Sequence, residues 1–405
     1  MFSFDLLARD GEARAGKLLT RHGTIETPSF VPVGTQGAVK SVSLRDLHVI
    51  GTQVIIVNSY HLHLQPGEDL IERVGGVHRF TGWEGPLITD SGGFQIFSLG
   101  VAKEHGVGKI APIFPEQRDR GRHFSSKSEK PLVRVDEDGV EFISYLDGSA
   151  HRFTPEGIVD IERKLGADII LVLDECTSPF HDYYYTREAM ERTHRWATRA
   201  LEVFRHTSDS TQAILGIVQG GAYRDLREGS ARFIAGLGFD GYAIGGSLGR
   251  SKKEMYQVLE WTIPFLPHDK PRHLLGVGEI EDIFQVVRRG VDLFDCILPT
   301  RMAQTGTFFA KKEDRFRIHI LNARFKDDLR PIELGCNCYT CRNYSRAYLR
   351  HLFMAKEILA MRLATIHNLH FLELLMRQIR SAIKQRRLAE LWREWVIPND
   401  ADPYA

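Results

Sequence analysis

The sequence predicts an α/β fold of the (β/α)8 barrel (TIM barrel) type, with a zinc-binding, mainly helical subdomain inserted near the C-terminus. Two observations point to the barrel: short apolar runs alternate with helical segments, and almost every run ends in a carboxylate, an amide or glycines. Strands that are apolar along their whole length are typical of parallel sheets covered on both faces. Eight such runs favour a closed barrel, and a doubly wound open sheet is the alternative.

The predicted strands occur at regular intervals within residues 1–300, the range that we expect to form the barrel together with an N-terminal β cap. They cover residues 29–33, 53–58, 86–90, 167–174, 213–219, 241–246, 272–278 and 293–299. Helical patterns follow at 187–206, 224–237 and 279–289. The pair Ser251 and Glu254 predicts a capping box at the start of one further helix.

The ends of these strands carry the residues that are most informative about chemistry. They are Asn58, Asp90 to Gly93, Asp174 and Glu175, Gln219, Gly245 and Gly246, Gly276 and Gly278, and Asp295. At any one strand end, a glycine that permits a tight turn or an acid that caps a helix is the simpler explanation. In a barrel, however, all strand ends converge on one mouth. Taken together, these strand ends predict a site lined by carboxylates, an amide and exposed glycine backbone.

Composition sets limits on location and partners. The chain has 405 residues, of which 43% are hydrophobic and 26% charged, and its net charge is +1, so any nucleic-acid footprint must be local. No apolar run reaches the roughly 18–20 residues of a spanning helix, and the N-terminus lacks a signal-peptide pattern. We therefore expect a cytoplasmic protein with no membrane partner. Residues 103–130 are polar and aperiodic, which predicts a loop insertion.

A cluster of cysteines predicts a metal site in the C-terminal region, residues 301–405. Cys336, Cys338 and Cys341 lie within six residues, and the total of five cysteines argues against a disulfide framework. Three thiolates at this spacing suit a structural, tetrahedral Zn²⁺, which needs a fourth ligand. Spacing alone does not choose among the downstream residues His351, His367 and His370. The alternative is three free or buried thiols. A closed site would pin the helical subdomain, with its C-terminal helices, to the barrel.

Long motifs along nearly the whole chain resemble those of the tRNA-guanine transglycosylases (queuine tRNA-ribosyltransferases), of the bacterial type. They are DSGGFQIFSL at 90–99, LDEC at 173–176, GIVQGG at 216–221, GYAIGG at 241–246, LLGVG at 274–278, FDCILPTR at 294–301, NARF at 322–325, the C-x-C-x-x-C, SRAY at 345–348 and IHN at 366–368. Because the motifs are long and occur in order, chance similarity is negligible. The resemblance implies a pentosyltransferase that exchanges a base in tRNA.

The resemblance also implies roles for individual residues. Asp295 resembles the nucleophile that forms a covalent ribosyl-enzyme intermediate, and Asp90 the general acid/base. The implied base-binding residues are Asp90, Ser91, Gly92, Gly93, Phe94, Asp174, Gln219 and Gly246. The implied RNA-binding residues are Gly276, Val277, Gly278, Glu279, Ile280, Glu281, Asp282, Thr300, Arg301, Met302, Ala303 and Gln304. His367 matches the fourth ligand of one structural Zn²⁺ per subunit.

These residue types suit the implied reaction. Base exchange needs an anionic nucleophile on one side of the sugar and a proton donor on the other, as in retaining glycosidases. Guanine presents two adjacent donors, N1–H and the 2-amino group, and the carboxylate of Asp174 can accept both. Adenine would leave this carboxylate unpaired, so the site would reject it. The target base must also leave its stack to reach a barrel mouth.

The resemblance implies the anticodon stem-loop of tRNAs with GUN anticodons as partner, and guanine exchange at the wobble position. We expect the incoming base to be the queuine precursor 7-aminomethyl-7-deazaguanine, with direct use of queuine as the alternative. Two departures bear on this. Residues 247–250 lack the acidic residue that is usual in the wall around the 7-substituent, and Gly249 there could widen the pocket. Gln304 stands where an arginine is usual, and an amide cannot neutralise a phosphate.

Other functions are compatible with parts of the sequence. A nucleoside hydrolase would use the same two carboxylates with water, but it would not explain the zinc subdomain or the basic helical residues of the C-terminal third. These are Arg342, Arg346, Arg350, Lys384, Arg386 and Arg387. A non-catalytic tRNA-binding subunit would be expected to have lost Asp90 and Asp295, and both are present. An archaeal-type member acting elsewhere in tRNA would be expected to carry additional C-terminal RNA-binding domains. The resemblance further implies a homodimer.

Overall fold

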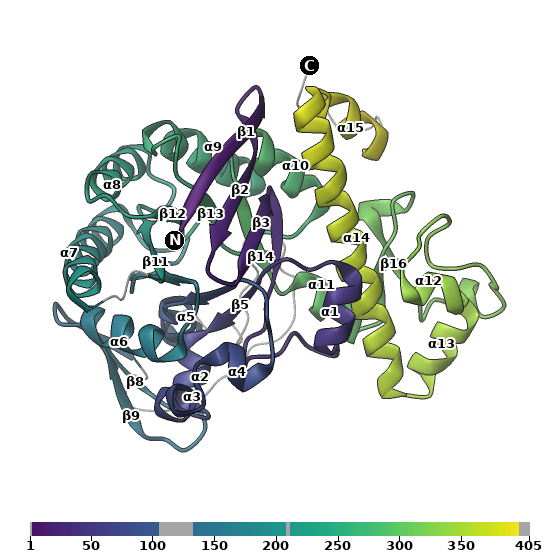
Figure 1. The fold of residues 1–405 in the computed structure, drawn as a ribbon, viewed down its shortest axis with the longest axis horizontal. Coiled ribbons are helices and arrows are strands. Elements are labelled where there is room, and N and C mark those ends of the chain that lie inside the picture. The colour runs from purple at the N-terminus through teal and green to yellow at the C-terminus, as the bar shows by residue number, and fades with distance from the viewer. Residues whose placement is uncertain (1, 105–132, 208–210, 397–405) are drawn as a thin grey trace.

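The computed structural model describes residues 2–104, 133–207 and 211–396, and a parallel barrel lies at its centre (Figure 1). Its strands are β4 (Ser29–Pro32), β5 (Ile55–Asn58), β6 (Leu87–Asp90), β10 (Ile169–Leu171), β11 (Ala213–Val218), β12 (Gly241–Ile244), β13 (Arg272–Leu274) and β14 (Leu293–Cys296). Their order is β4-β14-β13-β12-β11-β10-β6-β5. A parallel bridge between Val33 and Ile56 joins the two outer strands, so the sheet closes. The barrel prediction is therefore confirmed over the open sheet.

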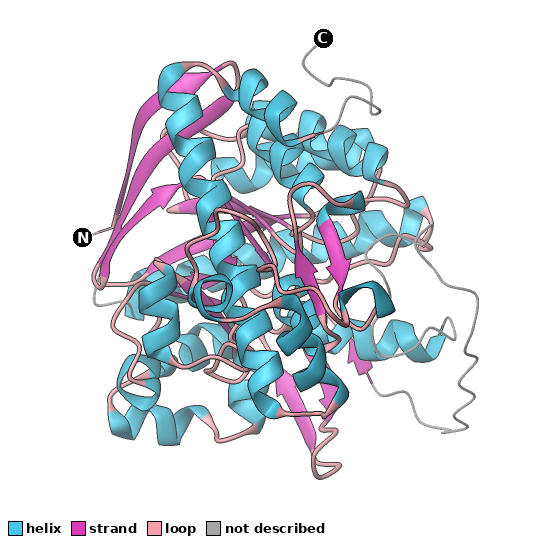
Figure 2. Ribbon diagram, turned by 90° about the vertical axis from the view of Figure 1, so that its right-hand side faces the viewer, coloured by secondary structure: helices cyan, strands magenta, loops and turns pink. Residues whose placement is uncertain are grey.

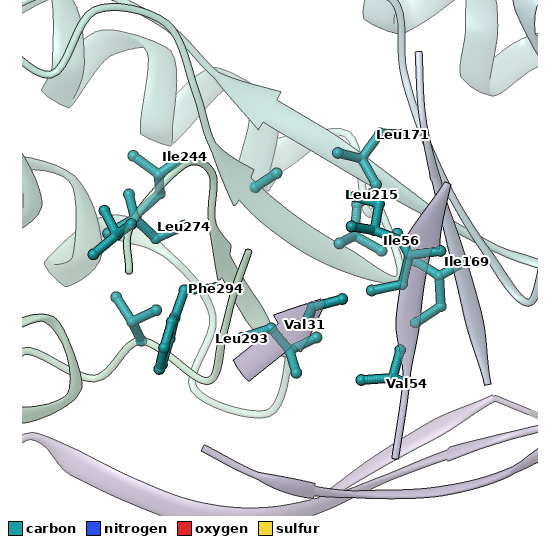
Figure 3. Close-up of a cluster of buried hydrophobic side chains, with 14 of the residues drawn as sticks. Val31, Val54, Ile56, Ile169, Leu171, Leu215, Ile244, Leu274, Leu293 and Phe294 are labelled. Carbon is teal, nitrogen blue, oxygen red and sulfur yellow. The ribbon is translucent and has the colours of Figure 1, made fainter. Parts of the chain in front are cut away.

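The barrel strands are apolar because both of their faces are covered. Side chains of neighbouring strands gather in one buried cluster (Figure 3), in which Val31, Ile56, Leu171, Leu215 and Phe294 are each at most 3% exposed. Burying one such side chain stabilises the fold by about 1.5–3 kcal/mol. An uncompensated polar group in this cluster would cost a similar amount. Polar residues consequently occur where the strands end.

Helices surround the barrel and connect its strands. They are α1 (Leu44–Ile50), α2 (Ser59–Leu64), α3 (Glu68–Val74), α4 (Val77–Thr81), α5 (Gly93–Glu104), α6 (Pro155–Leu165), α7 (Tyr183–Thr207), α8 (Arg224–Gly236), α9 (Lys252–Thr262), α10 (Ile280–Arg288) and α11 (Leu298–Gln304). Only one of the two hydrogen bonds of the capping box expected at α9 is present. The Ser251 side chain accepts from the Glu254 N–H, but the Glu254 carboxylate accepts from the N–H of Arg250.

Two small antiparallel sheets flank the barrel. The first contains β1 (Ser3–Asp10), β2 (Ala13–Thr20) and β3 (Gly23–Thr27), and its buried Arg14 pairs with Asp292 just before β14. The second contains β7 (Val133–Val135), β8 (Val140–Ile143) and β9 (Ala150–Phe153), between β6 and β10 in the chain. Apart from residues 103 and 104, which end α5, the insertion predicted at 103–130 lies outside the described residues.

The C-terminal region is mainly helical and packs beside the barrel (Figures 1 and 2). It contains β15 (Thr307–Phe309), β16 (Arg317–His319), α12 (Tyr339–Asn343), α13 (Arg346–Met354), α14 (Ile358–Gln385) and α15 (Leu388–Trp395). The first turns of α14 belong to a small separate core with Phe308 and Leu349, whereas its later turns belong to the barrel core. Helix α14 therefore links the two cores. Among the described helices, none is long and apolar enough to cross a membrane.

Candidate active site and metal centre

Asp90 lies at the carboxyl end of β6, in register with Asn58 at the end of β5. Its Oδ2 accepts hydrogen bonds from Asn58 Nδ2 at 2.6 Å and from Gln95 Nε2 at 3.3 Å. Its Oδ1 is enclosed and has no hydrogen-bond partner among the described residues. The two amides thus fix the carboxyl group through one oxygen and leave the other free to carry a proton.

The surroundings of Asp90 make it a weak acid. Burial raises the pKa of Asp90 to about 7, and the negative charge of Asp295 contributes to the same rise. The hydrogen bonds from Asn58 and Gln95 oppose this shift without cancelling it. A carboxyl group with a pKa near neutrality can both donate and accept a proton under physiological conditions, which is the property that a general acid/base requires.

Asp295 lies on β14, whose neighbours in the barrel are β13 and β4. Its Oδ1 is 3.0 Å from Nε2 of His273, a fully buried residue of β13, and its side chain remains 16% exposed. The barrel therefore presents two acids of different character at its mouth. Asp90 is enclosed and holds its proton up to near-neutral pH, whereas Asp295 reaches solvent and receives one hydrogen bond.

Asp174 and Gln219 form a second polar pair at the ends of β10 and β11. Gln219 Nε2 donates to Asp174 Oδ2 at 2.5 Å, and both side chains are buried. Two glycines make room for them: a Cβ on Gly93 would lie 2.8 Å from Asp174 Oδ1, and one on Gly246 would lie 1.9 Å from Gln219 Oε1. Burial raises the pKa of Asp174 to about 6. Asp174 is thus a buried carboxylate whose acceptor capacity is only partly used.

Arg227 binds the backbone next to Gln219 and Gly246, a role that was not predicted from the sequence. Its buried guanidinium donates four hydrogen bonds, to the carbonyl oxygens of Val218, Gly221, Gly245 and Ser247. Val218 ends β11, and the other three carbonyls belong to the loops after β11 and β12, which carry Gln219 and Gly246. Arg227 therefore ties the two loops together. No sequence signal marks it, because an arginine on an amphipathic helix such as α8 usually faces solvent.

The surroundings of Gly249 differ from the expectation that this glycine could widen a pocket. Gly249 has a φ of +95°, and a Cβ there would lie 2.5 Å from Glu254 Cβ. The space beside this glycine is therefore filled by Glu254 of α9. The carboxylate of Glu254 accepts from the Arg250 N–H at 2.6 Å. An acidic side chain thus reaches this segment after all, from the following helix.

The structure separates the remaining implied residues into exposed and buried groups. Phe94 lies in the first turn of α5 and is 61% exposed, so its ring is free to stack on a ligand. Of the implied RNA-binding residues, Arg301 is exposed, and Gly276, Glu279, Glu281 and Gln304 are partly exposed. The buried ones are Val277, Gly278, Ile280, Asp282, Thr300, Met302 and Ala303. Direct contact with an RNA phosphate through a charged side chain is thus open mainly to Arg301.

Cys336, Cys338, Cys341 and His367 converge in the C-terminal region, with their potential ligand atoms all within 4.8 Å of one another. His367 Nδ1 lies 3.6 Å from Cys338 Sγ and 3.3 Å from Cys341 Sγ, separations that suit ligands around one tetrahedral ion. His367 Nε2 lies 2.8 Å from the Phe309 carbonyl oxygen. This acceptor places the proton on Nε2 and turns the lone pair of Nδ1 toward the thiols.

The other two candidate histidines are less suited to this cluster. His370 Nδ1 approaches only Cys336, at 3.7 Å, and His351 is exposed and contacts the ring of Tyr348. A second group, His22, His78 and Asp168, also brings three possible ligands together. The two imidazole rings of this group stack at 3.6 Å, so an ion between them would lie outside both ring planes. Lone pairs lie in the ring plane, so of these two groups among the described residues the Cys₃His cluster is the one suited to a metal.

Comparison with known proteins now decides the family. The family model described as TGT, queuine tRNA-ribosyltransferase, matches residues 10–117 and 118–399. The chain belongs to the queuine tRNA-ribosyltransferase family. It is therefore an enzyme of the pentosyltransferase class, as the sequence motifs predicted.

Relatives in the queuine tRNA-ribosyltransferase family match over nearly their whole length. A protein of Archaeoglobus fulgidus, provisionally named queuine tRNA-ribosyltransferase, is 50% identical over 391 residues, which cover 95% of this chain and 96% of its own. The queuine tRNA-ribosyltransferase of Roseiflexus sp. (strain RS-1) is 46% identical and covers 97% and 99%. That of Herpetosiphon aurantiacus is 46% identical and covers 100% and 94%.

The environment of Asp90 predicts a pH-dependent effect of substitution on stability. The pKa of Asp90 rises from 3.8 to about 7 on folding, so between these values the folded state binds more protons than the unfolded state. This group therefore lowers stability progressively as pH rises from about 4 to 7. Asp90→Asn removes that loss. The melting temperature of the variant minus that of the unsubstituted enzyme should therefore be larger at pH 8 than at pH 5.

Thermal denaturation at both pH values measures this effect. Asp138→Asn, at a residue whose side chain is 83% exposed, is the matched control for loss of one negative charge. An equal shift at both pH values for Asp90→Asn would contradict the raised pKa.

Proposed function

We propose that this enzyme exchanges guanine in tRNA for a 7-deazaguanine base through a covalent ribosyl-enzyme intermediate. The observation that carries the proposal is the pair of unlike carboxyl groups at the barrel mouth. Asp90 retains a proton near neutral pH because of burial and the charge of Asp295, while Asp295 is accessible. Such a division between an acid and a nucleophile is the arrangement used by retaining glycosidases.

The reaction follows from these two roles. A carboxylate oxygen of Asp295 forms a bond to C1′ of the target ribose as the bond from C1′ to the guanine nitrogen breaks, and Asp90 gives its proton to the departing guanine. The incoming base then gives a proton to Asp90 and attacks C1′. The bond to Asp295 breaks, which restores both carboxyl groups to their initial states.

Recognition of guanine is the role that we assign to Asp174 and Gln219. Asp174 can accept both the N1–H and the 2-amino group of guanine, while Gln219 keeps the carboxylate in place through its 2.5 Å hydrogen bond. Phe94 is exposed and follows Gly93, whose backbone lies against Asp174, and it supplies a stacking surface. Gly93 and Gly246 allow the backbone to approach because any Cβ would collide with Asp174 or Gln219.

For the incoming base we favour 7-aminomethyl-7-deazaguanine, inserted at the wobble position of tRNAs with GUN anticodons. Support comes from the segment at 247–250, where the space beside Gly249 is filled by Glu254 and a carboxylate is nearby. A small cationic substituent suits such a wall better than the larger substituent of queuine. Direct use of queuine is the second candidate. It is favoured only by the presence of a glycine, Gly249, in the wall around the 7-substituent.

Competition between the two bases tests this choice. Release of labelled guanine from tRNA should proceed at lower concentrations of 7-aminomethyl-7-deazaguanine than of queuine, by about tenfold or more. Such a ratio corresponds to a difference of about 1.4 kcal/mol. Preference for queuine would overturn the choice of base while leaving the exchange reaction in place.

Substitution of the two carboxylates tests the proposed chemistry. Asp295→Asn should abolish the covalent adduct between enzyme and tRNA on a denaturing gel, because an amide is a poor nucleophile. Asp90→Asn should still bind tRNA but lose turnover by about 10²–10⁴-fold, the usual contribution of a general acid/base. Asp160→Asn, on the exposed face of α6, is the control. A persisting adduct in Asp295→Asn would disprove the nucleophile assignment.

We assign Zn²⁺ to the Cys₃His cluster. The cluster would supply three thiolate sulfurs and His367 Nδ1, and a site closed by four protein ligands serves structure rather than catalysis. The ligands come from α12, its preceding loop and α14. Because α14 belongs to both hydrophobic cores, an ion at this point would hold the small core in place against the barrel.

Removal of the ion should unfold the C-terminal region before the barrel. Chelation should lower the temperature at which the small core, between residues 303 and 364, becomes sensitive to proteolysis, because the ion contributes binding free energy to the folded state alone. Cys341→Ser should reproduce this effect and abolish the bound zinc. Cys296→Ser, at the barrel, should keep one zinc per chain. Unchanged melting of a metal-free protein would contradict a structural ion.

We propose that Arg301, which is exposed, contacts a phosphate of the tRNA.

We also propose that the enzyme forms a homodimer through an aromatic surface of the C-terminal region. Tyr339, Tyr344 and Tyr348 form a continuous series of ring contacts along α12, the residue after it and the start of α13, and Tyr339 and Tyr348 are 47% and 40% exposed. Exposed tyrosines in one cluster are typical of protein interfaces. In such a dimer, one subunit would hold tRNA while the other performs the exchange.

A further inference from the structure

His273 is a buried residue that the proposed reaction has not yet used. It lies in the middle of β13, paired with Ala243 of β12 and Leu293 of β14, and its side chain is completely inaccessible to solvent. The only hydrogen bond of its side chain among the described residues joins Nε2 to Asp295 Oδ1 at 3.0 Å. Its Nδ1 is enclosed and has no partner in the described part of the chain. A polar ring in this position requires an explanation, because an orphaned polar atom is costly.

The hydrogen bond determines the state of the ring. An ionised carboxylate can only accept, so the proton of the imidazole must lie on Nε2. Protonation of Nδ1 as well would place a second N–H in a position without an acceptor. The ring is therefore neutral, with its lone pair on the orphaned nitrogen. Asp295 receives a neutral donor rather than the full positive charge of an arginine or lysine.

The second oxygen of Asp295 is in a different situation. Oδ2 accepts no hydrogen bond from the described residues, and it is not enclosed. Since Oδ1 points to a buried ring, we attribute the 16% exposure of the Asp295 side chain to the end that carries Oδ2. One oxygen is thus held inside the barrel wall, and the other is presented at the mouth.

We propose that His273 is a positioning residue that selects Oδ2 of Asp295 as the attacking atom. This inference rests on the proposed function. The Nε2–H bond fixes the rotamer of the carboxylate and occupies Oδ1, so that Oδ2 forms the bond to C1′ as guanine leaves with the proton of Asp90. In the resulting ester, Oδ1 is the carbonyl oxygen and still accepts from Nε2. When the incoming base displaces the ester, negative charge returns to the carboxylate, and the same hydrogen bond stabilises the leaving group.

The neutrality of the donor matters for both half-reactions. A cationic partner would stabilise the free carboxylate so strongly that Oδ2 would be a poor nucleophile. Loss of the donor would leave the carboxylate free to rotate and would make it a poorer leaving group. A neutral imidazole lies between these extremes. His273 touches neither sugar nor base in this account, and it acts only through Asp295.

Two substitutions separate hydrogen bonding from packing. His273→Gln keeps a neutral N–H donor at a similar distance along the side chain, whereas His273→Leu keeps the volume and removes the donor. We expect His273→Leu to slow adduct formation in a single turnover by about 10–100-fold, the equivalent of one hydrogen bond to a charged group. Its KM for tRNA should stay within about twofold. His273→Gln should recover most of the rate.

The outcomes distinguish this inference from the function on which it rests. If His273→Leu forms the adduct at the rate of the unsubstituted enzyme, or if the glutamine variant is as slow as the leucine variant, the positioning role is wrong while base exchange stands. If the unsubstituted enzyme exchanges no base, the proposed function and this inference fall together. A rise in KM alone would also overturn the role, because positioning of a nucleophile affects the chemical step.

A measurement on the unsubstituted enzyme covers the case in which the leucine variant does not fold. Nitrogen-15 NMR of histidine-labelled enzyme should show one neutral ring protonated at Nε2 that is absent from the His273→Gln variant. Its Nε2 resonance should move when Asp295 is replaced by Asn. An imidazolium, or a ring protonated at Nδ1, would overturn the inference.

Discussion

Closure of the barrel is the constraint on which the whole site depends. The bridge between Val33 and Ile56 joins β4 to β5, and the eight strands then point their carboxyl ends to one rim. Asp90 and Asp295 are about two hundred residues apart in the chain and belong to strands that are not neighbours. Only a closed, parallel arrangement gives them a common mouth. An open sheet would separate the proposed acid from the proposed nucleophile.

Burial at this rim produces the chemistry and also costs stability. Several polar atoms there lack partners among the described residues, among them Asp90 Oδ1, Gln219 Oε1 and His273 Nδ1. Such atoms are expensive in an apolar surround, and they persist where a ligand or a proton supplies the missing interaction. The same enclosure that leaves Asp90 Oδ1 unpaired raises the pKa of this acid to about 7. Arg227 and His273, which are both buried, donate hydrogen bonds to neighbouring groups of the site.

The sequence predicted the barrel and the strand-end residues because both depend on local patterns. Apolar runs mark buried strands, and carboxylates or glycines mark their ends. Spacing also predicted the three cysteines, but it could not choose the fourth ligand, since the choice of His367 depends on how α14 packs against Phe309. Arg227 and His273 were not predicted, because their roles come from contacts between distant strands. The surroundings of Gly249 were not predicted for the same reason: Glu254, from another element, fills the space beside it.

Incubation of tRNA with labelled guanine tests the central claim most directly, since only an enzyme that cuts and reforms the same glycosidic bond can place free base into tRNA. Label should enter tRNA with the unsubstituted enzyme, and Asp295→Asn should incorporate none. Release of guanine without incorporation of label would contradict base exchange. It would instead show that the paired carboxylates at the barrel mouth serve hydrolysis.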